Sequence, residues 1–272
     1  MPGVHETAYP RLKASVTAHD LAAVYTPTSR EIALADTLPR TTAAKKLCFL
    51  LLLKTFQRLG YFVQLHDVPA QIVTHIRQCL GDKSLAVKLS AYDQSGTRRR
   101  HVQLIRQHLN VKMYDDAAHK LLATTVRVAA QTKEELVDII NIGIEELIHQ
   151  RYELPGFTTL LEEAQHGRAE VNRAIYQRIA EALGDDGRIL ADDLLTTDLV
   201  TRRTKWNALK GDPGKPTLTE LRHLVDHLRW LSEQNAGIAA FAAIPDVKMR
   251  HWTLEAKSLD AARMSEMEPN NS

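Results

Sequence analysis

Long apolar runs are missing from this 272-residue sequence, and their absence argues against a membrane protein. The longest run, residues 47–53, is far shorter than the roughly 20 apolar residues of a membrane-spanning helix. Arg11 and Lys13 near the N-terminus are followed by no apolar stretch, so no secretory signal is indicated. We therefore expect a soluble, cytoplasmic protein.

Cysteine is equally scarce. Cys48 and Cys79 are the two cysteines, and neither belongs to a CxxC motif or to a Cys/His spacing typical of a metal site. This excludes a disulfide framework, and we expect buried, reduced thiols. No metal or other cofactor is expected.

Glycine and proline are few, at 12 and 10 residues, whereas Ala, Leu, Arg, Glu and Gln are plentiful. This composition favours helix over strand. The one weak strand candidate is residues 61–65, so the sequence predicts an all-α fold. The net charge is only +2, so an argument for nucleic-acid binding depends on where the charges lie.

Helical periodicity and start signals predict a series of helices. A Thr followed three residues later by Glu has the spacing of a capping box at Thr28, Thr132, Thr159 and Thr217. The segment 41–59 is apolar on nearly every side and is expected to be a central core helix. The predicted helices span residues 28–37, 41–59, 69–80, 84–92, 97–109, 115–130, 133–150, 159–183, 188–196, 198–210, 217–233 and 246–264.

Breaks in the helical pattern predict the domain organisation. Pro and Gly interrupt it within residues 152–156 and again within residues 211–216. We therefore predict two tandem multi-helix domains, residues 1–152 and 153–264, followed by a polar tail, residues 265–272.

Catalytic constellations are absent or weak. Aspartates form adjacent pairs at 115–116, 185–186 and 192–193, and neighbours on a helix do not face each other as a metal clamp requires. His223 and His227 are four residues apart but lack the HExxH pattern. No phosphate-binding glycine loop or GxSxG motif occurs, so we predict no catalytic residues.

The most distinctive segment is residues 95–109. Val102, Ile105 and Leu109 share one helical face, and a Ser-Gly turn with the predicted helix 84–92 precedes them. This order is typical of a helix-turn-helix, in which Arg reads guanine and Gln reads adenine. The alternative is a solvated helix face that is basic by chance. The candidate DNA-binding residues here are Arg98, Arg99, Arg100, Gln103, Arg106 and Gln107.

Two later segments carry further DNA-binding candidates. In residues 154–183, a turn at His166 and Gly167 would create a second helix-turn-helix, and the alternative is one continuous bundle helix. A basic stretch that ends in the loop 211–216 suits contacts with backbone phosphates, whereas Trp206 is interpreted as a core anchor. The candidates in these segments are Arg168, Arg173, Gln177, Arg202, Arg203, Lys205, Lys210 and Lys215.

Several sequence blocks, in this order, resemble the N-terminal region of Tn-three-type replicative transposases. Together they span nearly the whole chain. The blocks are ETAYPRL (6–12), YTPT with Glu31 (25–31), LKTFQRLGYF (53–62) with Val68-Pro69, TRRRH (97–101) with Ile105-Arg106, LPGFTTL (154–160), WNALK (206–210), PTL (216–218), IP (244–245) and EAKSLD (255–260).

This resemblance implies DNA recognition. In that family the N-terminal helical domains bind the terminal inverted repeats of the transposon, and a distant RNase-H-like domain with three acidic residues cuts and joins strands. Nothing in this sequence matches that acidic triad. We expect a bacterial, nucleoid-associated DNA-binding fragment that is not an enzyme, with double-stranded DNA and either the full-length transposase or a second copy as partners. The rival hypothesis is an all-α protein-interaction module.

Overall fold

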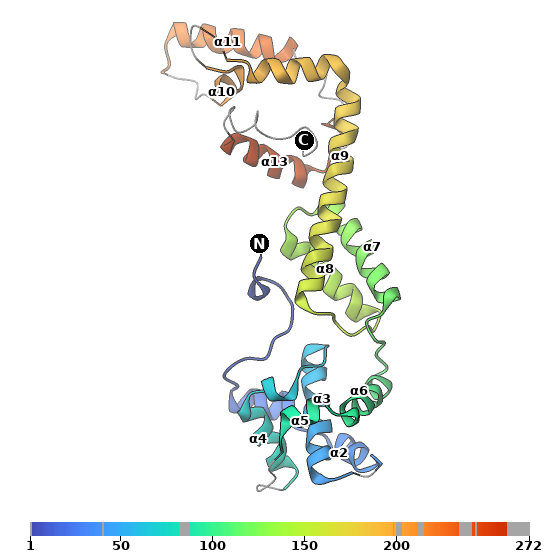
Figure 1. Ribbon diagram of the computed structural model, residues 1–272. Helices are drawn as coiled ribbons and strands as arrows, with labels where there is room; N and C mark the ends of the chain where they lie inside the picture. Colours follow the sequence, from blue (N-terminus) through green and yellow to red (C-terminus); the bar gives the residue numbers. More distant parts are fainter. Residues whose placement is uncertain are drawn as a thin grey trace. The chain divides into compact units, whose positions relative to one another are not determined.

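The protein is all-α, as the sequence predicts (Figure 1). The computed structural model describes residues 2–39, 41–81, 87–197, 199, 203–210, 215–233, 241–242 and 244–259. Extended pairing within these residues is limited to two isolated bridges, Lys112 with Tyr152 and Thr197 with Thr204. The strand candidate at 61–65 was wrong, because the chain there is irregular and enters a 3₁₀ turn at Leu65.

The helices follow one another closely along the chain. In order they are η1 (Val4–Glu6), α1 (Ala18–Asp20), η2 (Leu21–Tyr25), α2 (Ser29–Asp36), α3 (Ala43–Leu59), η3 (Leu65–Asp67), α4 (Ala70–Cys79), α5 (Leu89–Asp93), α6 (Gly96–Leu109), α7 (Asp116–Thr132), α8 (Leu136–His149), α9 (Phe157–Leu195), α10 (Lys205–Leu209), α11 (Leu218–Glu233) and α13 (Asp246–Ser258).

The chain divides into two compact units that are not continuous in sequence. The first comprises residues 1–125 and 140–163, and the second comprises residues 126–139 and 164–272. The break within residues 152–156 is observed as a loop between α8 and α9. The predicted domains, 1–152 and 153–264, stay a prediction, and the predicted tail, 265–272, lies outside the described residues.

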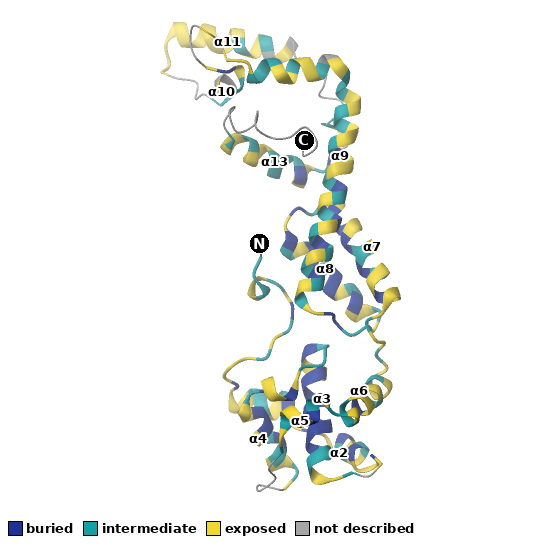
Figure 2. Ribbon diagram, viewed as in Figure 1, coloured by how far each residue is buried: buried dark blue, intermediate teal, exposed yellow. Residues whose placement is uncertain are grey.

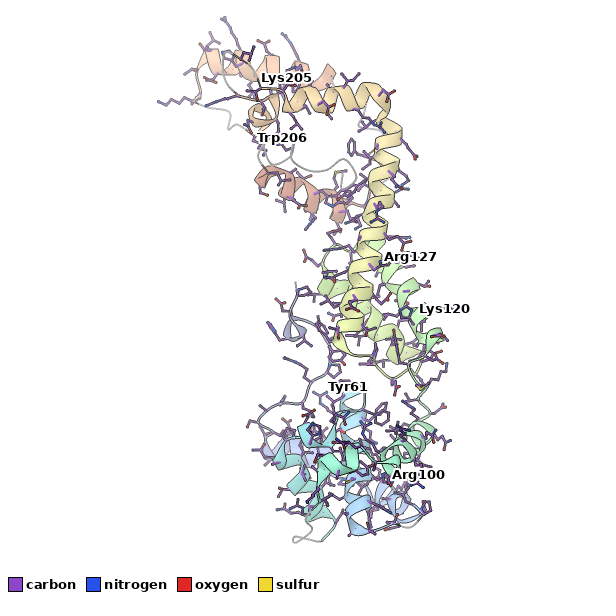
Figure 3. The ribbon with its side chains drawn as sticks, viewed as in Figure 1. Tyr61, Arg100, Lys120, Arg127, Lys205 and Trp206 are labelled. Atoms are coloured by element: carbon purple, nitrogen blue, oxygen red, sulfur yellow. The ribbon has the colours of Figure 1, made fainter. Side chains whose placement is uncertain are left out.

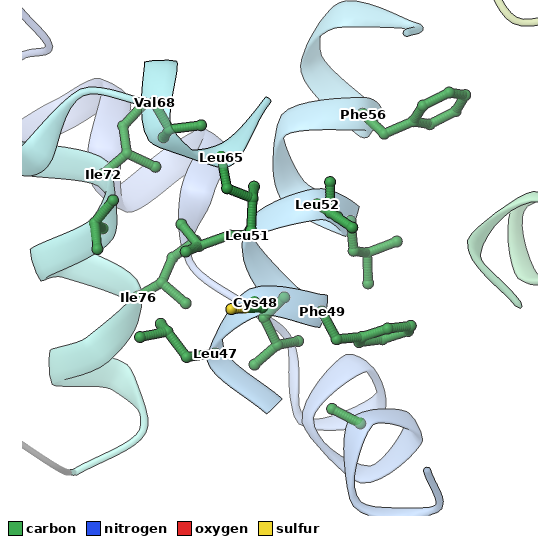
Figure 4. Close-up of a cluster of buried hydrophobic side chains, with 14 of the residues drawn as sticks. Leu47, Cys48, Phe49, Leu51, Leu52, Phe56, Leu65, Val68, Ile72 and Ile76 are labelled. Carbon is green, nitrogen blue, oxygen red and sulfur yellow. The ribbon is translucent and has the colours of Figure 1, made fainter. Parts of the chain in front are cut away.

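The first unit is built around α3. Thr42 caps its start by accepting a hydrogen bond from the amide of Lys45, and Gly60 ends it in the left-handed region with a φ of 75°. Every residue from Leu47 to Phe56 is buried (Figure 2), and Leu47 and Leu51 lie in one apolar cluster with Ile72 and Ile76 of α4 (Figure 4). This confirms the prediction of a central core helix.

A polar cluster lies in the core of the second unit. Lys248 of α13 is fully buried, and its Nζ donates to Glu134 Oε2 and to Asn172 Oδ1, both at 2.6 Å. Asn172 in turn donates to Glu134 Oε1 at 3.2 Å. The cluster therefore joins α13 and α9 to the residues that connect α7 with α8.

Two of the four predicted capping boxes lie at the start of a helix. Thr28 and Glu31 form the complete capping box, and Thr217 accepts from the amide of Glu220 at 3.2 Å. The other two boxes were wrong. Thr132 is the last residue of α7, and Thr159 lies inside α9, which begins at Phe157.

The two cysteines form no disulfide. Cys48 and Cys79 are both free; Cys48 is buried as expected, but Cys79 is exposed. Among the helices described, none combines the length and the apolar composition required to span a membrane.

Candidate nucleic-acid interface

The predicted helix-turn-helix lies in the first unit and is formed by α5 and α6. A two-residue turn, Gln94 and Ser95, joins them, and the Ser95 side chain accepts a hydrogen bond from the amide of Arg98 at 3.3 Å. α5 is short, five residues, and residues 84–86 of its predicted range lie outside the described part of the chain. α6 matches its predicted range to within one residue.

The inner face of α6 fixes its orientation. Val102 and Ile105 are buried, as predicted, and so is His101. Nδ1 of His101 lies 2.6 Å from the hydroxyl of Tyr92, which ties α6 to α5. The His101 ring also packs edge-on against Phe49 of α3. These contacts turn the opposite side of α6 outward.

The outer face of α6 is basic and carries amides. Arg99, Arg100, Gln103 and Gln107 are all exposed, and Figure 3 shows the position of Arg100. None of the ion pairs found among the described residues involves Arg99 or Arg100. The sequence contains no Asp or Glu between Asp93 and Asp115. This face therefore has a local positive charge that the total charge of +2 conceals.

Arg98 and Arg106 are placed differently from the other candidates on α6. Arg98 donates to the carbonyl of Val63 at 3.0 Å, and its Nε lies 3.4 Å from Asp93. Arg106 forms a two-pronged ion pair with Glu153, with nitrogen–oxygen distances of 3.0 and 2.8 Å. Both guanidinium groups hold α6 against neighbouring segments. The two side chains therefore position α6 and are not directed toward solvent.

Sequence reasoning missed a hollow beside α6. It lies between the segment that follows α2, the first turn of α3, and α6, and it has a volume of about 460 Å³. Leu38 and Lys45 contribute to its wall together with Arg100 and Gln103. No sequence signal connects Leu38 or Lys45 with α6, because about 60 residues separate them.

The second candidate segment, in α9, is one continuous helix through His166 and Gly167. The alternative with a turn there was therefore wrong. Gly167 is buried, and a Cβ at this position would lie 3.0 Å from Val126 Cγ2, so a small residue is needed for close helix packing. Arg168 donates to the carbonyl of Glu134 at 3.2 Å, whereas Arg173 and Gln177 are exposed.

The third candidate segment surrounds α10 in the second unit. Lys205, labelled in Figure 3, pairs with Asp193. Lys210 donates to the carbonyl of Leu259, and its Nζ lies 4.8 Å from the centre of the Trp206 ring. Trp206 is partly buried and donates to the same carbonyl at 3.3 Å, which agrees with an anchoring role. Arg203 and Lys215 are exposed, and Arg202 lies outside the described residues.

Metal-ligating side chains do not converge among the residues that the structure describes. In the described part of the chain, no group of three or more His, Cys, Asp or Glu side chains has the arrangement of a metal site. His223 and His227 lie on α11, and no third His, Cys, Asp or Glu among the described residues completes a metal site with them.

The fold and this site define an all-α protein with a basic, amide-bearing helix that follows a tight turn. Residues 4–166 match the model of a family described as a domain of unknown function, DUF4158. Because this match covers more than half of the chain, the protein belongs to that family. A search of curated proteins gave no match.

Proposed function

We propose that this protein binds double-stranded DNA through the outer face of α6. The observation that carries the proposal is the set of exposed side chains Arg99, Arg100, Gln103 and Gln107 on a helix that follows a tight turn and contains no acidic residue. Guanidinium and amide groups are the side chains that recognise guanine and adenine in the major groove. The proposal assigns base contacts to Arg99 and Gln103 and phosphate contacts to the other cations.

Arg98 and Arg106 have a different role in this proposal. Their ion pairs with Asp93 and Glu153 fix the direction of α6, so they present the helix to DNA without reading bases. In the second unit, the exposed Arg173, Gln177, Arg203 and Lys215 are the remaining candidates for backbone contacts. Lys205, Lys210 and Arg168 form ion pairs or hydrogen bonds within the protein, and Arg203 also has an interaction there.

The sequence resemblance suggests the biological setting. We propose that the DNA is the terminal inverted repeat of a transposon and that the chain is the recognition part of a Tn-three-type transposase. It would take part in transposition without being the catalyst, on DNA in the bacterial nucleoid. Its protein partner would be the full-length transposase or a second copy of this chain.

Fluorescence anisotropy tests this proposal. The labelled duplex carries the inverted repeat of the element that encodes the chain, and a scrambled duplex of the same length is the control. We expect tighter binding to the inverted repeat and a steep loss of affinity between about 50 and 200 mM salt, because phosphate contacts release counterions. Equal affinity for both duplexes would contradict sequence-specific recognition.

Substitutions on α6 sharpen the test. We expect Arg99→Ala to cost about 1–3 kcal/mol of binding free energy on the inverted repeat, and Gln103→Ala to weaken discrimination from the scrambled duplex. Lys120→Ala is the matched control, because it removes one exposed cation from α7 (Figure 3). A negligible loss in both α6 variants would move the contact surface elsewhere.

A second candidate function is self-association through α11. This helix exposes Leu218, Leu221 and Leu228 at 66%, 56% and 55% of their surface, on positions spaced as in a coiled-coil seam. Contiguous exposed apolar side chains mark protein interfaces. Analytical ultracentrifugation of the protein and of Leu221→Glu distinguishes the functions, since a dimer that this variant dissociates supports the interaction module.

A further inference from the structure

The hollow beside α6 has the size of a ligand site. Its volume of about 460 Å³ falls within the range of roughly 300–1,000 Å³ that small-molecule sites occupy. It opens on the helix face to which DNA binding is assigned above. A duplex on that face would therefore lie against its mouth.

Cations and amides line this hollow, and none of the described residues that line it is an Asp or Glu. Lys45 from the first turn of α3 and Arg100 from α6 contribute the positive charges. Gln103 and Gln107, one helical turn apart on α6, contribute the amide groups. The cations can bind an anionic group, and the amides can both donate to and accept from the polar edge of a planar ring.

The apolar part of the wall is equally defined. Leu38, which is buried, and Leu104, which is half-buried, lie among the polar groups. Apolar side chains of this kind pack against the flat face of a base that has left its stack. The hollow thus combines a surface for a planar ring with partners for a negative charge.

The electrostatics of the wall agree with an anionic ligand. His101 lies in this wall, and burial, followed by the charges of Arg100 and Lys45, lowers its pKa to about 4. Two separate cations from α3 and α6 thus act on the same point. Positive charge at this wall favours a phosphate over a neutral ligand.

We propose that this hollow holds one unstacked nucleotide of the bound DNA. Lys45 and Arg100 contact its phosphate, Gln103 and Gln107 bond the edge of its base, and Leu38 and Leu104 pack against the base. This inference rests on the proposed function, because it assigns the occupant to DNA bound at α6. A base that stays paired and stacked in the duplex cannot enter the hollow. A nucleotide that is already unpaired should therefore bind more tightly, because no unpairing energy is spent.

Duplexes with and without an unpaired nucleotide test this inference. One duplex carries a single bulged 2-aminopurine in the inverted repeat, and the other is fully paired. We expect the bulged duplex to bind about tenfold more tightly, with a change in 2-aminopurine fluorescence that the free duplex does not show. Leu104→Trp, which fills the hollow without changing charge, is expected to bring the affinity ratio close to one.

Arg99→Ala is the matched control, because Arg99 lies on α6 but does not line the hollow. It should weaken both duplexes equally and keep their ratio. Tight binding of both duplexes with equal affinity and no fluorescence change would overturn the nucleotide site and leave the proposed function standing. No binding to either would overturn both. Binding of free deoxyadenosine monophosphate, without any preference for the bulge, would overturn the assignment to DNA.

Discussion

The two compact units are held together by different physical means. In the first unit, α3 is buried from Leu47 to Phe56, so apolar contacts dominate. In the second unit, the fully buried Lys248 forms 2.6 Å bonds with Glu134 and Asn172. The first unit also has a buried ion pair, Glu31 with Lys54, but its Nζ–oxygen distances are 3.4 Å. We therefore expect the second unit to be more sensitive than the first to the loss of a single buried charge.

The largest effect is expected from Lys248→Ala. Removing this ammonium leaves Glu134 buried without its main partner, which costs about 3–5 kcal/mol of the free energy of unfolding. Urea denaturation followed by circular dichroism measures the change. The double variant Glu134→Leu/Lys248→Met should recover most of the loss, because it removes both charges. A single variant as stable as the unmodified protein would show that the cluster is not what holds this unit together.

The apolar counterpart is Leu51→Ala in the first unit. Leu51 is fully buried, so the truncation removes apolar contacts and leaves a cavity. We expect a loss of about 2–5 kcal/mol in the free energy of unfolding. Leu221→Ala on α11 is the matched control, because Leu221 is 56% exposed and its truncation should change stability little. Equal losses in both variants would contradict the difference in burial.

An effect of intermediate size is expected from pH. Burial, Arg100 and Lys45 lower the pKa of His101 from 6.5 to about 4, so the folded protein binds fewer protons than the unfolded chain between these values. The contribution of His101 to stability is therefore present above pH 6.5 and is lost as the pH falls toward 4. Between pH 7.5 and 5.0 the loss is about 2 kcal/mol.

His101→Gln isolates this contribution. Glutamine keeps a hydrogen-bond acceptor for the Tyr92 hydroxyl but does not titrate. We expect a shallower dependence of the free energy of unfolding on pH in this variant than in the unmodified protein. Identical pH profiles would show that His101 does not produce the acid sensitivity.

The smallest effect is expected from Arg127→Ala. Arg127, labelled in Figure 3, pairs with Glu170 at 3.0 Å in the same unit as the buried cluster, but the two side chains are 50% and 44% exposed. Water screens an exposed pair, so the loss should stay below about 1 kcal/mol. A loss as large as that of Lys248→Ala would remove burial as the explanation of the difference between the two ion pairs.

The sequence predicts those features that are determined by residues close together in the chain, namely the helices and their buried faces. The apolar run around Leu50 predicts a core helix, and the Ser95 turn with the pattern Val102, Ile105 predicts α6 and its inner face. Both signals are local, because helical periodicity and capping act within a few residues. The all-α class follows from many such signals.

Long-range partners were beyond sequence reasoning. Nothing in the sequence near Arg106 indicates its ion pair with Glu153, which lies 47 residues later in the chain. No pattern in the sequence distinguishes Lys248, yet it is fully buried. The hollow next to α6 is likewise created by packing. Tertiary contacts decide which of several similar side chains face solvent, and no local pattern encodes them.

One glycine sets the course of the longest helix. Gly184 has φ 61° and ψ −164°, and it interrupts the helical geometry of α9. No atom crowds this position, so space alone would admit a larger residue. Its backbone conformation belongs to a region that is essentially restricted to glycine. We therefore expect a chiral residue at position 184 to force a different backbone conformation there. A single mutation in this codon would then change the direction of the eleven residues that follow in α9.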